Sequence, residues 1–88
     1  MSRMKLVGGV REMQRHPELI EHIGRYVTRY EPELAPFGQQ WIWTTDDPEK
    51  ALQLPSSEMF RLYRKSIGTR PLDGKPDRPI SIYEVEIA

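Results

Sequence analysis

Apolar and polar residues alternate along this chain with two different periods, and each change of period marks an expected element. Between Pro17 and Tyr30 the apolar positions recur every three or four residues, which is typical of one face of an α-helix. A second helical pattern begins at Ser56 or Ser57 and ends at Gly68, a residue type that commonly follows a helix end. We therefore expect one main helix in each of these stretches.

Stretches of period two, or rich in β-branched and aromatic residues, predict the strands. In residues 80–87, three apolar side chains fall on one face and two glutamates on the other. Residues 39–45 are rich in β-branched and aromatic side chains, and residues 2–7 alternate over a shorter stretch. A short helix is expected over residues 48–54, because proline follows a capping aspartate there and proline comes again after the stretch.

Together these elements predict a small two-layer α+β domain. It should have two or three short antiparallel strands, with the two main helices and the short helix packed on one face. The chain has 88 residues, enough for a single core, so residues 1–88 should form one domain. It has no cysteine and no apolar run of the ~18 residues that a membrane helix needs. These features favour a soluble, cytoplasmic protein without a thiolate metal site, and no cofactor is expected.

Charge is distributed unevenly, although 13 basic residues balance 13 acidic ones. Residues 31–58 are strongly acidic and residues 59–78 strongly basic. The basic side chains follow the last predicted helix into a loop over 69–79 that is rich in proline and charge, and they can contact phosphates or an acidic protein. Alternatively, those near the helix C-terminus simply complement the helix dipole. The candidate partner-binding cations are Arg61, Arg64, Lys65, Arg70, Lys75 and Arg78.

The sequence Trp41-Ile42-Trp43 places apolar side chains on both faces of a predicted strand. Burial of both faces requires a layer on each side of the sheet, which a domain of this size can hardly supply. One interpretation is a partner or dimer interface anchored by Trp41 and Trp43. The other is a bulge or register change that turns these residues inward.

Catalytic motifs are absent. The acid–base candidates are His22 with Glu18, and Glu84 with Glu86, but no spacing among them matches a known nucleophilic or metal site. We assign no catalytic or metal-ligating residue.

The leading hypothesis is a small non-catalytic interaction domain that binds another protein or itself, such as a regulatory or inhibitory protein of a mobile element. The alternative is a nucleic-acid-binding module that uses the basic helix and loop over 61–78. The third is a small enzyme without a recognised motif.

Overall fold

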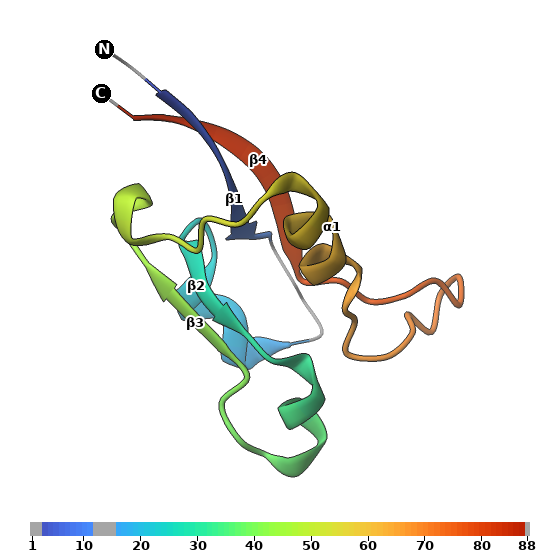
Figure 1. Ribbon diagram of the computed structural model, residues 1–88. Helices are drawn as coiled ribbons and strands as arrows, with labels where there is room; N and C mark the ends of the chain where they lie inside the picture. The colour runs from blue at the N-terminus through green and yellow to red at the C-terminus, as the bar shows by residue number, and fades with distance from the viewer. Residues whose placement is uncertain (1–2, 12–15, 88) are drawn as a thin grey trace.

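The computed structural model describes residues 3–11 and 16–87. These residues form one antiparallel sheet of four strands in the order β3-β2-β1-β4 (Figure 1). The strands are β1 (Arg3–Val10), β2 (Tyr26–Tyr30), β3 (Ile42–Thr45) and β4 (Ile80–Ile87).

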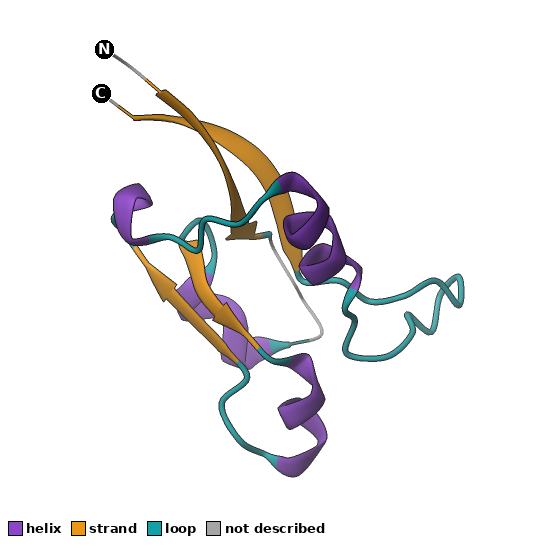
Figure 2. Cartoon of the chain, viewed as in Figure 1, coloured by secondary structure: helices purple, strands orange, loops and turns teal. Residues whose placement is uncertain are grey.

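Among the described residues there is one α-helix, α1 (Ser56–Arg64), which lies against β1 and β4 (Figure 2). The other helical segments are short 3₁₀ turns: η1 (Pro17–His22), η2 (Pro32–Phe37) and η3 (Pro48–Lys50). The fold is therefore mostly sheet. The prediction of two main helices and one short helix over two or three strands was wrong.

The main error concerns residues 17–30, which form a 3₁₀ turn followed by β2 rather than one helix. Gly24 has a φ of 81° and ends the helical turn. The apolar spacing of three between Val27 and Tyr30 comes from a bulge, because the register between β2 and β3 shifts between Val27 and Arg29. The extra residue turns both Val27 and Tyr30 to the buried side, so a bulged strand reproduced the spacing of a helix.

Other expectations for single elements had mixed outcomes. The predicted strand over 80–87 is confirmed as β4, and the helix beginning at Ser56 as α1, which ends at Arg64 and not at Gly68 as expected. The predicted helix over 48–54 is reduced to η3, because the chain is extended from Ala51 onward. Phe37 is 74% exposed, although a large apolar ring favours burial.

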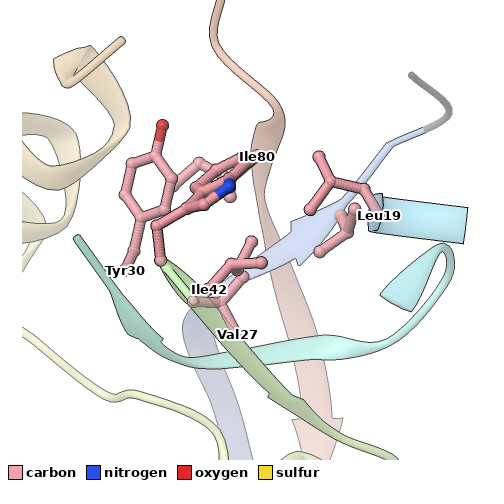
Figure 3. Packing of buried hydrophobic residues seen from close by; sticks show 7 residues of the cluster. Leu19, Val27, Tyr30, Ile42 and Ile80 are labelled. Carbon is pink, nitrogen blue, oxygen red and sulfur yellow. The ribbon is translucent and has the colours of Figure 1, made fainter. Parts of the chain in front are cut away.

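The core lies between the sheet, η1 and α1, and Figure 3 shows its main side chains pointing toward one another. Leu62 and Tyr63 of α1 pack against this cluster from outside, as do Leu34, Ala35 and Ile67. The buried members are Val10, Leu19, Val27, Tyr30, Trp41, Ile42 and Ile80.

The long β1–β4 ladder contains a close approach at Gly9. A side chain at this position would overlap the ring of Tyr83, which lies across the glycine. The Tyr83 ring also contacts that of Tyr26, with ring centroids 6.1 Å apart. Glycine is therefore required here so that two aromatic rings can pack over the sheet.

Candidate anion-binding pocket

Loop 69–79 is held by its own backbone hydrogen bonds and projects from the end of α1 (Figure 1). At its base, Asp77 donates its N–H to the Gly68 carbonyl and accepts from Ile67, at 2.8 and 3.0 Å. Nearer the tip, the N–H groups of Arg70 and Gly74 are both satisfied within the loop, and Gly74 takes a φ of 68°. The loop therefore has a defined hairpin-like shape that can position side chains.

A small pocket of about 190 Å³ lies where this loop meets the end of β1 and the side of α1. Arg11 follows β1 directly, and its backbone N–H donates to the Pro79 carbonyl at 3.2 Å, which ties the two segments together. Four of the six lining residues are cationic. We call this site the basic pocket; it is lined by Arg11, Tyr63, Arg70, Lys75, Pro76 and Arg78.

Two of the guanidinium groups have donor capacity that the described residues leave unused. The Nε atoms of Arg11 and Arg78 are buried and have no hydrogen-bond partner within residues 3–11 and 16–87. The guanidinium carbon of Arg78 lies 5.8 Å from the centre of the Tyr63 ring, which favours a cation there. A buried donor without a partner costs about 1–3 kcal/mol, so an acceptor that reaches either Nε–H would recover part of this cost.

Arg70 is held differently, by a two-point contact with Asp73. Its Nε and Nη2 atoms donate to the two carboxylate oxygens at 3.2 and 2.6 Å. The pKa of Asp73 is lowered, most by the hydrogen bond from the Lys75 backbone N–H and further by the Arg70 charge, against opposing desolvation. Asp73 thus fixes the loop and neutralises one of the four cations, while the Lys75 side chain stays exposed.

A buried polar layer lies behind the pocket. Asp77 is 5% exposed, and its Oδ2 lies 3.0 Å from Nε2 of His16. Burial raises the pKa of the Tyr30 hydroxyl well above its ordinary value; the negative charge of Asp77 raises it further, and the cations Arg11 and Arg78 oppose this. Arg11 and Arg78 are therefore close enough to Tyr30 to act on the same buried region as Asp77.

The structure divides the predicted cations into two groups. Arg70, Lys75 and Arg78 meet in the basic pocket, whereas Arg61 and Lys65 line a separate groove beside α1. Arg61 approaches Glu58 at 3.7 Å, and Arg64 is exposed and lines neither site. They therefore do not form one continuous basic surface.

Sequence reasoning missed Arg11. Arg11 follows the predicted strand over 2–7, and no sequence pattern connects it with the distant loop over 69–79. The signal that could have found it is the length of the β1–β4 pairing: if the chain is paired up to Val10 and Ile80, the residues just beyond both strands must be neighbours.

The two tryptophans do not form an exposed pair. Trp41 is 4% exposed and packs in the core, where its ring centre lies 6.0 Å from that of Tyr30. Trp43 is half-buried, and the guanidinium carbon of Arg29 covers its ring at 4.5 Å. A role for these residues in partner binding stays a prediction, and it would rest on Trp43.

A larger cavity of about 430 Å³ lies between η1 and residues 38–42, beside His22. His22 Nδ1 lies 2.6 Å from the Thr44 hydroxyl on edge strand β3, whereas Glu84 and Glu86 lie on the opposite edge strand, β4. Glu18 lines the same cavity as His22 but lies 3.5 Å from His16, so the four acid–base candidates do not form one common site. In residues 3–11 and 16–87, no three His, Cys, Asp or Glu side chains are grouped to hold a metal ion.

No protein-family model, curated protein or solved structure matches this chain. In the part of the chain that the structure describes, no helix has the length and apolar character needed to cross a bilayer.

Proposed function

We propose that this chain is a non-catalytic interaction domain that docks an anionic group of a partner protein in the basic pocket. The observation that carries the proposal is the convergence of four cations from two separate parts of the chain on one pocket, which Tyr63 also lines. Two of these cations hold buried Nε–H donors without a partner among the described residues.

Charge distribution favours a protein partner over a nucleic acid. The chain has a formal net charge of zero, and residues 31–58 carry six acidic residues and one basic residue. A long polyanion gains affinity from many phosphate contacts at once and is repelled by such acidic segments. A single acidic group on a protein needs only the pocket.

The proposal can be tested by NMR titration of the ¹⁵N-labelled protein with a capped hexaglutamate peptide at low salt. We expect the Nε–H signals of Arg11 and Arg78 to shift, and Lys75→Gln to weaken binding by about fivefold, in line with an exposed charge contact of ~1 kcal/mol. Arg61→Gln is the matched control, because it removes one charge outside the pocket and should leave affinity within about twofold.

Other results would contradict the proposal. If hexaglutamate shifts no pocket signal, or if Arg61→Gln weakens binding as much as Lys75→Gln does, the pocket is not the docking site. If only an oligothymidylate binds, with an affinity that falls steeply with salt, the nucleic-acid alternative replaces this proposal.

The anionic group belongs either to another protein or to a second copy of this chain. The mass of the protein in solution separates these cases: a concentration-dependent dimer that Lys75→Gln dissociates would identify a second copy.

A further inference from the structure

We infer that the group recognised by the basic pocket is a phosphate monoester, carried by a phosphorylated side chain of the partner protein. This inference rests on the proposed function and narrows it, from anionic groups in general to one dianionic group.

The size of the pocket sets the first limit. Its volume of about 190 Å³ lies below the ~300–1,000 Å³ of pockets that enclose drug-sized ligands. The pocket therefore suits one charged group at the end of a side chain. A nucleotide would leave its base and sugar outside.

The supply of donors sets the second limit. With Arg70 held by Asp73, three cations of the pocket lie outside that ion pair: Arg11, Lys75 and Arg78. A carboxylate has one charge and two oxygens. A phosphate monoester carries about −1.5 to −2 charges and three acceptor oxygens, which matches two guanidinium groups and one ammonium more completely.

The surroundings discriminate against a phosphodiester backbone. A diester carries a single charge and continues as a chain on both sides, so its neighbouring phosphates would approach Asp73 at the exposed tip of the loop. A monoester ends at the phosphate and avoids this repulsion. It also brings its second charge to the cations outside the Arg70–Asp73 ion pair.

Two closely matched ligands test the inference: N-acetyl-O-phosphotyrosine amide and N-acetyl-O-sulfotyrosine amide. They have nearly the same shape, but at pH 7.5 the phosphate is mostly a dianion and the sulfate a monoanion. We expect the phosphate ligand to bind about tenfold more tightly at pH 7.5, equivalent to ~1.4 kcal/mol, with shifts centred on the Arg11 and Arg78 Nε–H signals.

At pH 5.5 the phosphate is mostly a monoanion, since its second pKa is near 6, and the ratio of the two affinities should fall toward one. His16, Asp77 and Tyr30 lie behind the pocket and Asp73 beside it, and the sulfate ligand, whose own charge is the same at both pH values, reports any change in affinity that the protein itself causes. A ratio that does not change with pH would overturn the inference.

A second comparison uses ligands that have no aromatic ring. Capped phosphoserine should bind more tightly than capped glutamate, and both Lys75→Gln and Arg11→Gln should remove most of the difference, whereas Arg61→Gln should not. Inorganic phosphate at the same concentration should shift the same signals more weakly, since it lacks the attached peptide.

The outcomes separate this inference from the proposed function. If sulfate and phosphate ligands bind equally, and glutamate binds as well as phosphoserine, the pocket is a general acidic-group site and the monoester inference fails alone. If no anion shifts the pocket signals, both fail. If inorganic phosphate binds as tightly as the phosphoamino acids, the ligand is the free ion and not a modified protein.

Discussion

The core around Trp41 and the loop over 69–79 are stabilised by different interactions. In the core, apolar side chains from β2, β3, β4 and η1 are almost fully covered, and Leu19, Val27 and Ile80 are at most 1% exposed. In the loop, the structure depends on backbone hydrogen bonds and on one ion pair, and Leu72 at its tip is 95% exposed.

This difference assigns stability and binding to different parts of the molecule. Apolar burial provides most of the free energy of folding, so a change in the core should be felt by the whole domain. The loop buries little apolar surface, and its acidic and basic side chains do not fully neutralise one another. Such segments can be altered for binding at small cost in stability.

The largest effect should come from Trp41→Ala. Removing this buried ring should lower the free energy of unfolding by about 3–5 kcal/mol, because a large cavity opens beside Tyr30. Chemical denaturation followed by circular dichroism measures the loss. Trp43→Ala is the matched control and should cost less than about 1 kcal/mol, since its half-exposed ring loses mainly the Arg29 contact. Equal costs would contradict the assignment of Trp41 alone to the core.

A smaller loss is expected for Gly9→Ala. The added methyl group overlaps the Tyr83 ring and must displace it from Tyr26, at a cost of about 1–3 kcal/mol. Tyr83→Ala should make the same glycine substitution nearly neutral, because the obstructing ring is then gone. Thermal unfolding of the two single variants and the double variant tests this coupling.

Tyr30→Phe should cost about 1 kcal/mol, because the Tyr30 hydroxyl donates to the Lys65 carbonyl at 3.0 Å and would leave that carbonyl without it. The wild-type protein should also lose stability as pH rises above ~10, the pKa of an unfolded tyrosine, since the folded state holds the proton that the unfolded state releases. Below that pH the contribution is fully present.

Tyr30→Phe should make this alkaline loss shallower without abolishing it, because burial also raises the pKa of Tyr83. Denaturant unfolding between pH 8 and 11 provides the comparison. An identical slope in the variant would show that Tyr30 is not the buried phenol responsible.

The smallest effect on stability should come from Lys75→Gln. An exposed side chain without an ion pair in the described chain should change the free energy of unfolding by no more than about 0.5 kcal/mol. The same substitution should weaken binding of acidic ligands severalfold, as measured by the titrations above. A much larger loss in the free energy of unfolding would show that the loop contributes to the stability of the core.

Whether an element could be predicted depends on how far apart in the sequence the residues that specify it lie. α1 and β4 could be predicted, because periodicity and alternation act within a few residues. β2 could not, since its bulge depends on pairing with β3, and the spacing of Val27 and Tyr30 has the same appearance in a helix. The cations of loop 69–79 could be marked as a candidate site from composition. Arg11 could not, because only the pairing of distant strands brings it there.

The β1–β4 ladder has a consequence for the order of folding. Its pairs join Arg3 with Ile87 and Val10 with Ile80, so they link residues at least 70 positions apart. During synthesis on the ribosome, β1 emerges first and must wait for β4 before its ladder can form, and contacts of such high sequence separation form slowly. The β2–β3 hairpin can form much earlier. The basic pocket, which needs Arg11 tied to Pro79, is therefore completed only when the last strand has docked.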